Sequence, residues 1–248
     1  MHAATIIFDL DGTLVDTAPD LAETLNVVLR REGFPAIPYD EARRLVGAGA
    51  RRMIERGIAS GGGARPAADI DRLFNDFLAY YADHVADRSR AFPGVVEALD
   101  ILAARGCRFA VCTNKLEWLS VRLLNALGLA DRFVAICGQD TFAVQKPHPD
   151  ALHGTLRKAG GTLHRAVMVG DSHTDIATAH AAGIPIIAVD FGYTQIPVAQ
   201  LAPDRIISHF NALPDSIADV LATRGGPAGA AAAPPGKTRR RRNPPLRR

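Results

Sequence analysis

The stretch that decides the fold is residues 5–14, TIIFDLDGTL. An apolar and partly β-branched run is followed by two carboxylates, Asp9 and Asp11, and then by a glycine and a threonine. The run predicts a buried strand that ends at a polar tip. In an extended chain, side chains two positions apart point to the same side, so both carboxylates would face one small volume. Two like charges held this close repel unless a cation lies between them or one is protonated, and either arrangement indicates chemistry.

Two other sites that contain paired acids do not fit this stretch. A calcium loop needs glycine at its sixth position and glutamate at its twelfth, but counting from Asp9 these are Leu14 and Asp20. An aspartic protease takes its carboxylates from two distant segments, and nothing later in the chain repeats this stretch. A strand end with surface acids followed by a turn remains the structural alternative, and we favour the catalytic interpretation.

Composition indicates a globular protein with one large core and room for a small second domain. The chain has 248 residues, of which 48% are hydrophobic and 22% charged. No apolar run approaches the length of a membrane span, and the first residues lack the features of a secretory signal, so we expect a cytoplasmic protein with no membrane association. The three cysteines, Cys107, Cys112 and Cys137, form no CxxC pair, and we expect them to be small core residues.

The positive net charge comes from the end of the chain. The whole chain carries +3, and residues 224–248 contribute seven arginines and one lysine with no acid, so residues 1–223 carry −5. Residues 223–248 are rich in Ala, Pro and Arg and predict a disordered tail. The four arginines at 239–242 could contact nucleic acid or an anionic membrane, but we prefer solvated charge and do not expect nucleic acid as a partner.

Residues 16–91 show only helical periodicity. Apolar residues recur at helical spacing over 21–29, a segment from 40 to 56 is interrupted at 46–50, and the clearest apolar stripe runs from 70 to 85. We find no alternating strand pattern in this part of the sequence. An all-helical domain is therefore predicted for residues 16–91.

The pattern changes at residue 92, where helices and short apolar runs begin to alternate. The runs are 107–112, 133–137, 166–169 and 184–189. Alternation of this kind predicts βαβ units and a parallel sheet that is covered on both faces. We therefore predict an α/β fold, with a Rossmann-like parallel sheet core formed by residues 1–15 and 92–222. The all-helical cap would be inserted above the carboxyl ends of the strands, where ligands usually bind.

Polar side chains follow successive strands of the predicted sheet. Residues 113–115, Thr-Asn-Lys, come after one strand, Asp171 and Asp175 come after another, and Lys146 lies between them before a proline and a new helix. Each cluster alone could be a turn or a helix cap. Because parallel strands all end at the same edge of the sheet, we expect these residues to converge with Asp9 and Asp11.

The converging acids predict a metal site. Asp171 and Asp175 are four residues apart at a helix start, so they can share a face and join Asp9 around a hard cation. Magnesium fits oxygen ligands better than zinc does, since no Cys/His cluster has ligand spacing. His173 lies inside the motif, where we interpret it as a solvated or structural residue.

The same residues predict phosphoryl chemistry. With a metal screening the charges, a carboxylate can attack phosphorus and form an acyl phosphate. The hydroxyl of Thr113, the amide of Asn114 and the ammonium of Lys146 would stabilise the phosphoryl oxygens.

Four motifs of residues 4–222 resemble the haloacid dehalogenase-like hydrolases that have a helical cap. The motifs are DLDGT at 9–13, CTNK at 112–115, QKP at 145–147 and GDSHTD at 170–175. The resemblance implies that Asp9 is the nucleophile, and that Asp11 protonates the leaving oxygen and later activates water. It also implies a metal held by Asp9, the backbone carbonyl of Asp11, and Asp171, with Asp175 nearby, directly or through water.

The resemblance separates two chemistries found in this superfamily. Dehalogenases also use the first aspartate but lack the second, so Asp11 favours phosphoryl transfer. Thr113 and Lys146 would hold the phosphoryl oxygens. Gly12 fits a tight turn after the acids, where we expect a side chain to crowd the phosphate.

Within the family, the segments 46–50, 182–185 and 191–193 are most similar to phosphoglycolate phosphatases. This similarity implies hydrolysis of a small phosphorylated substrate, 2-phosphoglycolate, to glycolate and phosphate. In the cap, Gly47 and Gly49 would allow a loop to approach the site, and Arg51 or Arg52 would meet an anionic substrate group. The alternative is that these arginines form a solvated helix face.

Two other functions stay open at this point. A sugar phosphomutase of the same superfamily would share Asp9 and Asp11, and the basic tail could give the chain a binding role on nucleic acid or an anionic surface. The sequence determines neither the oligomeric state nor any purpose for the tail.

Overall fold

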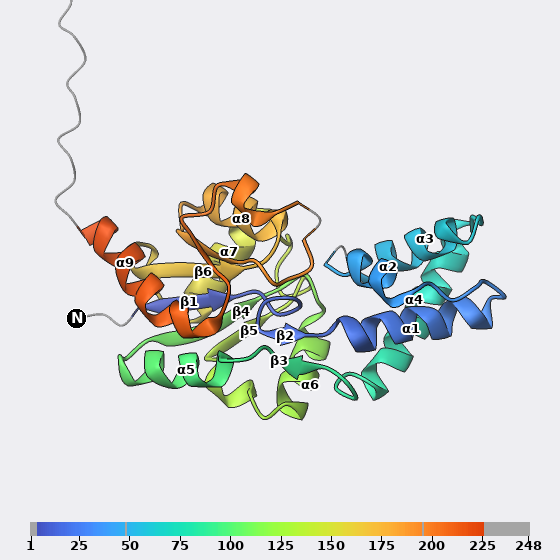
Figure 1. Ribbon diagram of the computed structural model, residues 1–248, viewed down its shortest axis with the longest axis horizontal. Helices are drawn as coiled ribbons and strands as arrows, with labels where there is room; N and C mark the ends of the chain where they lie inside the picture. The colour runs from blue at the N-terminus through green and yellow to red at the C-terminus, as the bar shows by residue number, and fades with distance from the viewer. Residues whose placement is uncertain (1–3, 48, 195, 226–248) are drawn as a thin grey trace, which may run out of the picture.

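A computed structural model describes residues 4–47, 49–194 and 196–225 and shows an α/β core joined to a group of helices (Figure 1). The strands are β1 Thr5–Phe8, β2 Val15–Asp16, β3 Arg90–Ala91, β4 Arg108–Cys112, β5 Ala135–Cys137, β6 Ala166–Gly170, β7 Ile186–Val189 and β8 Arg205–Ile207. The α-helices are α1 Ala18–Arg31, α2 Tyr39–Leu45, α3 Ala50–Ser60, α4 Ala67–Asp83, α5 Val95–Ala104, α6 Glu117–Ala126, α7 Pro149–Lys158, α8 His173–Ala182 and α9 Leu213–Gly225. Short 3₁₀ helices are η1 Ala130–Arg132, η2 Leu163–Arg165, η3 Val198–Leu201 and η4 Phe210–Ala212.

The opening strand lies in the middle of a parallel sheet with the order β5-β4-β1-β6-β7-β8. It pairs in parallel with β4 on one side and with β6 on the other, so Phe8 is opposite both Val111 and Val169. The chain adds β4 and β5 on one side of β1 and then crosses to add β6, β7 and β8 on the other. The point at which the strand order reverses is where open α/β sheets bind ligands.

Helices cover both faces of the sheet, which confirms the predicted α/β fold. Alternate residues of β1 explain the arrangement, because Ile6 and Phe8 pack with apolar residues of α5, α6 and α9, whereas Ile7 packs with those of α7 and α8. Figure 1 shows α7 and α8 above the sheet and α5 and α6 below it. The side chains of Ile6, Ile7 and Phe8 are fully buried. The near-continuous apolar run read from the sequence is thus the consequence of burial on both faces.

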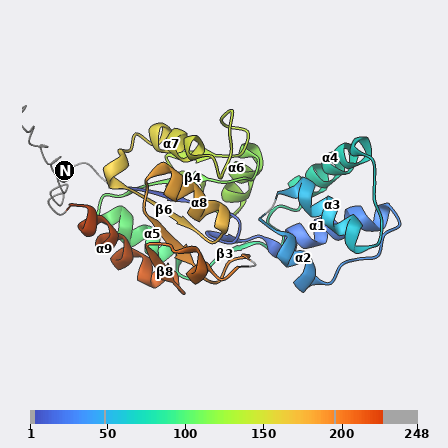
Figure 2. The same cartoon turned by 90° about the horizontal axis from the view of Figure 1, so that it is seen from above.

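Helices α1 to α4 pack against one another beyond the carboxyl ends of the strands (Figures 1 and 2). They share an apolar interior that includes Leu25, Met53, Phe77 and Tyr81. The break predicted near residues 46–50 separates α2 from α3, with Val46 extended and Gly49 at a φ of 88°. The conformation at Gly49 is in the region that favours glycine, so the loop needs this residue type.

The connection between the helices and the core differs from the sequence prediction. Residues 16–91 were expected to be wholly helical, but Asp16 and Arg90–Ala91 belong to an antiparallel ribbon, β2 with β3. Each strand of the ribbon has two residues, which is too short for an alternating pattern to be visible in sequence.

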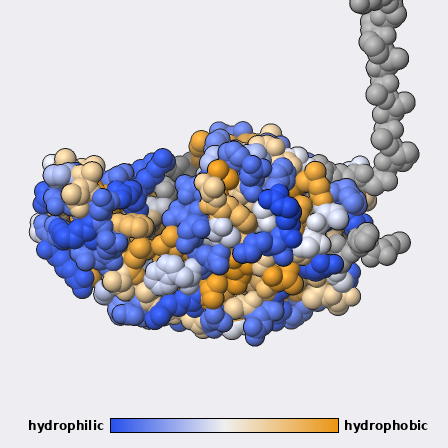
Figure 3. Space-filling model, turned by 180° about the vertical axis from the view of Figure 1, so that it is seen from behind, coloured by the Kyte–Doolittle hydropathy of each residue, from blue (hydrophilic) through white to orange (hydrophobic). Residues whose placement is uncertain are grey.

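The end of the chain adds β8 and α9, which the periodicity analysis did not find. Helix α9 reaches Gly225, three residues into the segment expected to be a disordered tail, and residues 226–248 of that tail lie outside the described residues. In the part of the chain that is described, no helix is long and apolar enough to cross a membrane. Hydrophilic residues dominate the surface of the helical part on the face seen in Figure 3.

Candidate functional site

The predicted site residues meet at the carboxyl ends of β1, β4 and β6. These three strands are neighbours in register, so the residues that follow them leave the sheet at the same edge. Asp9 follows β1 directly, Thr113 follows β4 and Asp171 follows β6. The structure therefore brings together residues that are up to 162 positions apart in the sequence.

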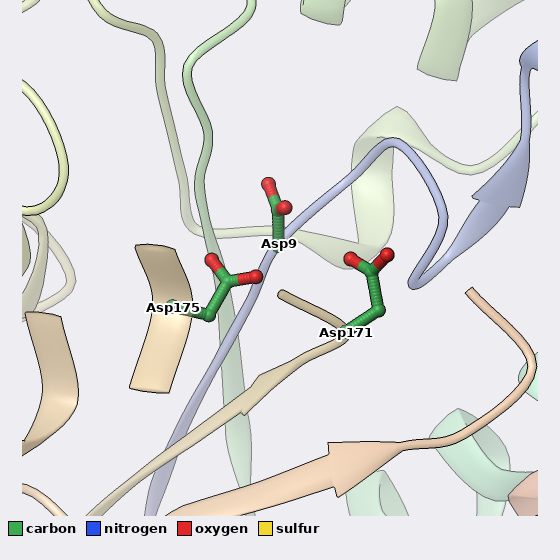
Figure 4. A group of neighbouring side chains, drawn as sticks. All are labelled: Asp9, Asp171 and Asp175. Atoms are coloured by element: carbon green, nitrogen blue, oxygen red, sulfur yellow. The ribbon is translucent and has the colours of Figure 1, made fainter. Parts of the chain in front are cut away.

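Three buried carboxylates form the centre of this site. Oxygen atoms of Asp9, Asp171 and Asp175 all lie within 4.8 Å of one another. Figure 4 shows the three side chains lying near one another, from the end of β1, the end of β6 and helix α8. The side chain of Asp11 does not belong to this cluster, because its carboxylate contacts Lys115; the metal ligand predicted at this position is the backbone carbonyl.

Lys146 offsets part of the negative charge. Its Nζ lies 2.9 Å from Asp9 Oδ1 and 2.5 Å from Asp175 Oδ1, and its side chain is 2% exposed. Burial alone would lower the pKa of Lys146, but the two carboxylates prevail and raise it above its ordinary value. In this geometry the direct partners of Lys146 are the carboxylates of Asp9 and Asp175.

The single positive charge of Lys146 does not neutralise the three carboxylates. Burial, and then repulsion by Asp175, raise the pKa of Asp9 to about 7. Burial, and then the charges of Asp175 and Asp9, raise the pKa of Asp171 to about 8. Raised pKa values in a cluster of acids indicate a site with too much negative charge, which a bound cation would relieve.

The carboxylate of Asp171 is held in a fixed cradle. Thr13 Oγ1 donates to its Oδ1 at 3.0 Å, and the backbone N–H of Tyr193 donates to its Oδ2 at 2.7 Å. A Cβ added to Gly12, which has a φ of 83°, would lie 2.6 Å from Asp171 Oδ2, and one added to Gly192 would lie 2.2 Å from Asp171 Cβ. A side chain at Gly12 would therefore collide with Asp171 and Tyr193.

Asp175 is bound on both of its oxygens. Its Oδ1 contacts Lys146, and its Oδ2 accepts from Ser172 Oγ at 2.6 Å and from the Ser172 backbone N–H at 3.1 Å. Ser172 Oγ in turn accepts from the Asp175 N–H, which completes a capping box at the start of α8. His173, the first residue of α8, is exposed and lines a larger cavity described below.

The segment after β4 supplies further polar atoms near Asp9. Thr113 is buried, and its Oγ1 accepts from the Lys115 backbone N–H at 3.2 Å. Asn114 Nδ2 donates to the carbonyl of Lys146 at 3.0 Å, and its Oδ1 is buried without a hydrogen-bond partner. Thr113 and Asn114 both line a cavity that contains Asp9 and Asp11.

Two cavities open from the carboxylates toward the helical part. The smaller, of about 70 Å³, includes Asp9, Asp11, Gly47 and Gly49, and its far side is apolar. The larger, of about 300 Å³, includes Asp9, Asp11, Lys146 and Asp171. Its wall from α2 and α3 carries three arginines, Arg44, Arg52 and Arg56. An anionic group bound next to the carboxylate cluster would therefore meet cationic side chains.

Arg51 does not occupy the place predicted for it. Its guanidinium pairs with Asp71 and lies over the ring of Phe74, 5.8 Å from the ring centroid, and it lines neither cavity. Adjacent residues of an α-helix differ in direction by about 100°, so only one of two neighbouring arginines can face the site. Of these two arginines, Arg52 lines the larger cavity.

Contacts between the cap helices and the core also involve residues that sequence reasoning did not single out. Tyr193 Oη donates to Asp16 Oδ1 at 2.5 Å and accepts from the Ala18 N–H at 3.0 Å. Arg43 of α2 donates to the carbonyls of Phe191 and Gly192 and lies over the Tyr193 ring. These contacts join the loop at 191–193, which holds Asp171, to the helical part. The paired residues are between 148 and 177 positions apart in the sequence.

A hard divalent cation fits the donors present. The three converging groups are carboxylates, Asp9 Oδ1 makes no hydrogen bond although Lys146 is near, and the raised pKa values of two of the acids indicate uncompensated charge. Magnesium prefers few carboxylates together with water and phosphate oxygens. Among the described residues, the ligand atoms that converge here are all carboxylate oxygens and include no cysteine sulfur, which argues against a thiolate metal site.

Comparison with known proteins places the whole of this arrangement in one family. The family described as haloacid dehalogenase-like hydrolase matches residues 6–189, which contain all four motifs. The chain is 50% identical over 226 residues to a phosphoglycolate phosphatase from Mesorhizobium japonicum, which covers 91% of this chain and 100% of that protein. It is 46% identical over 222 residues to a phosphoglycolate phosphatase from Agrobacterium fabrum, covering 90% and 95% of the two chains.

A solved structure supports the same relation. The crystal structure of a predicted phosphoglycolate phosphatase from Haemophilus somnus 129pt is 30% identical and superposes with a TM-score of 0.79, covering 86% of this chain and 97% of that one. The similarity thus extends over both the sheet and the helices inserted after β2.

Proposed function

The chain belongs to the haloacid dehalogenase-like hydrolases, and we propose that it is a magnesium-dependent phosphatase that converts 2-phosphoglycolate to glycolate and phosphate. The convergence of Asp9, Asp171 and Asp175 with Lys146 carries the proposed chemistry. The choice of substrate is supported by the names of relatives that match the chain over nearly its whole length. Both observations support an enzyme that hydrolyses phosphoric monoesters.

Asp9 is the proposed nucleophile. Its carboxylate stands at the end of β1, contacts Lys146 and lines a cavity together with Thr113 and Asn114. An Asp9 oxygen forms a bond to phosphorus while the bond from phosphorus to the glycolate oxygen breaks, which leaves an aspartyl phosphate. Thr113 and Asn114 would donate to the phosphoryl oxygens, and Lys146 would hold Asp9 and offset its charge.

Asp11 is the proposed acid and base. It lies two residues from Asp9 and lines both cavities beside it. In the first step Asp11 gives its proton to the departing glycolate oxygen. In the second it accepts a proton from the water that attacks phosphorus, so that the bond to Asp9 breaks and phosphate is released.

The metal would be held by Asp9, Asp171 and the backbone carbonyl of Asp11. When bound, Mg²⁺ would neutralise charge on the acids and on the phosphoryl oxygens. Thr13 and Tyr193 keep the Asp171 carboxylate in one orientation, which is the role expected of groups around a metal ligand. Both oxygens of Asp175 are already engaged, so we assign it the role of anchoring Lys146 and Ser172 beside the metal.

Specificity for a carboxylate is proposed to come from the arginine wall. Arg52 and Arg56 lie on one face of α3, four residues apart, and line the cavity that contains Asp9 and Lys146. A guanidinium is well suited to a carboxylate because it presents several donors in one plane. The glycines at 47 and 49 let the loop before α3 approach the site, since both have positive φ.

The experiment that tests the proposal is phosphate release from a panel of phosphomonoesters. The full chain with Mg²⁺ would be assayed on 2-phosphoglycolate, ethyl phosphate, sugar phosphates, nucleotides and pyrophosphate. We expect the highest kcat/KM for 2-phosphoglycolate and a large drop for ethyl phosphate, which lacks the carboxylate. Isomerisation of a sugar phosphate without phosphate release would overturn the proposal, and Asp9→Asn protein is the control for contaminating phosphatase.

A further inference from the structure

Lys115 is a buried cation to which the proposed chemistry assigns no role. It follows β4, and its Nζ contacts both oxygens of Asp11, at 3.0 Å and 3.2 Å. On its other side the same ammonium lies over the ring of Tyr81, 4.5 Å from the ring centroid. The Lys115 side chain is 5% exposed, and Tyr81 is 1% exposed. Lys115 thus joins the end of β1 to helix α4 of the cap.

The backbone of Lys115 is fixed by the core. Its N–H donates to Thr113 Oγ1 at 3.2 Å, and its carbonyl accepts from the Gln139 N–H at 3.0 Å. A Cβ added to Gly138 would lie 2.6 Å from the Lys115 carbonyl oxygen, so the neighbouring loop packs closely on this peptide. The backbone from which the Lys115 side chain extends is therefore fixed by the core.

Asp11 is the ionic partner of Lys115. Burial alone would lower the pKa of Lys115, but the Asp11 carboxylate prevails and raises it. Burial raises the pKa of Tyr81 to about 12, so its ring is neutral and can attract the ammonium through its face. Among the ion pairs of the described residues, Lys115 has Asp11 as its partner.

We propose that Lys115 is the positioning residue of Asp11 and that Tyr81 makes this position depend on helix α4. The contact with both carboxylate oxygens fixes the direction in which Asp11 points, which a single hydrogen bond would not do. The acid is then correctly placed when the cap helix lies over Lys115. This inference rests on the proposed function, since it needs Asp11 to act as the acid.

Substrates with different leaving groups distinguish a loss of acid positioning from a general structural defect of the active site. Glycolate and ethanol must be protonated as they leave phosphorus, whereas acetate leaves from acetyl phosphate without a proton. The parameter kcat/KM reports the step in which the leaving group departs. Loss of a positioned acid should therefore lower kcat/KM for 2-phosphoglycolate and ethyl phosphate far more than for acetyl phosphate.

The principal variant is Lys115→Met, which keeps an unbranched side chain of similar length. We expect kcat/KM for 2-phosphoglycolate and ethyl phosphate to fall about 100-fold, and that for acetyl phosphate to change by less than about threefold. Lys115→Gln keeps a donor without the charge and should lie between wild type and Lys115→Met. If circular dichroism shows that Lys115→Met is not folded, the comparison is made with Lys115→Gln instead.

Helix α4 offers a matched pair of variants for the cap contact. Tyr81→Leu removes the ring over Lys115 and should show the same selective loss, about tenfold. Tyr80→Leu removes the neighbouring ring, which stacks on His84 with a centroid distance of 4.2 Å and lies under Arg31. The Tyr80 variant should retain the wild-type ratio between acetyl and ethyl phosphate.

The outcomes distinguish the inference from the function beneath it. An equal loss on all three substrates in folded Lys115→Met or Lys115→Gln protein would show a merely structural role and overturn the proposal. Equal ratios in Tyr81→Leu and Tyr80→Leu would overturn the part that concerns the cap. A wild type that cleaves ethyl and acetyl phosphate but shows no preference for 2-phosphoglycolate would refute the proposed substrate, while the ratio of kcat/KM for those two substrates would still test Lys115.

Discussion

Replacing Gly192 by alanine should disable the site through one steric contact. Gly192 follows Phe191 in the loop that passes over Asp171, and its backbone is not in the positive φ region, so alanine meets no backbone strain there. The added Cβ would lie 2.2 Å from Asp171 Cβ and 2.3 Å from its Oδ2, whereas real Cβ contacts are essentially never under 3.0 Å. Asp171 and the loop must therefore move apart by about 1 Å, which is enough to cost about 100-fold in rate when it displaces a reacting or binding group.

Two measurements define the expected result for Gly192→Ala. The value of kcat/KM at saturating Mg²⁺ should fall about 100-fold, and the Mg²⁺ concentration for half-maximal activity should rise about tenfold or more, because Asp171 is a proposed metal ligand. Overpacking of this kind should also lower the free energy of unfolding by about 1–3 kcal/mol, measured by urea denaturation. The metal dependence is the readout that links the loss to Asp171.

Gly128 provides the control for loss of stability alone. It follows α6 with a φ of 66°, and a Cβ there would meet nothing within 4 Å. Gly128→Ala should lower the free energy of unfolding by about 1 kcal/mol through backbone strain while leaving kcat/KM and the Mg²⁺ requirement unchanged. A Gly192→Ala enzyme with wild-type Mg²⁺ requirement and kcat/KM within about threefold of wild type would refute the reasoning, since the cradle would then tolerate the collision.

Three further predictions follow from the acids of the chain. Asp9→Asn should lower phosphate release by about 10⁴-fold or more with no loss of melting temperature, because it removes one of the repelling charges; substantial residual turnover would exclude Asp9 as the nucleophile. In EDTA, the free energy of unfolding should fall as the pH rises from about 4 to about 8, because the raised pKa values of Asp9 and Asp171 let the folded state hold protons that the unfolded state releases. The increase in melting temperature on adding Mg²⁺ should accordingly be larger at pH 8 than at pH 5, and equal increases would contradict the cluster as the metal site. Asp20→Asn should lower the free energy of unfolding, measured in urea, by about 2–4 kcal/mol. The reason is that the buried Asp20 carboxylate accepts hydrogen bonds from the N–H groups of Arg88 and Ser89 and from the Ser89 hydroxyl. An effect under about 1 kcal/mol would show that the amide satisfies these donors.

Local patterns in the sequence were sufficient for the parallel sheet and for most helices of the cap. Strands buried on both faces require apolar runs, and cap helices require stripes at helical spacing, so these elements are visible without knowledge of their neighbours. The two-residue strands of the β2–β3 ribbon were not found, because two residues carry no periodicity. Strand β8 was not found either.

The convergence of the acids could also be predicted from sequence. Parallel strands end at one edge of the sheet, so Asp9, Thr113 and Asp171 had to lie near one another once the alternation of strands and helices was recognised. The motifs add the identity of each group. What such reasoning cannot provide is the direction of a side chain within the site.

The tertiary structure alone decided which side chains meet. Lys115 and Asp11 are 104 residues apart, and their contact depends on the paths of two loops after neighbouring strands. Gly12 and Gly192 are required by the position of Asp171, which neither local stretch records. Arg52 faces the cavity and Arg51 faces Asp71 because the turn of α3 relative to the core separates them by about 100°. The sequence by itself thus determined the elements and the chemistry of the opening stretch, since both are local, whereas side-chain pairing is set by packing across the whole fold.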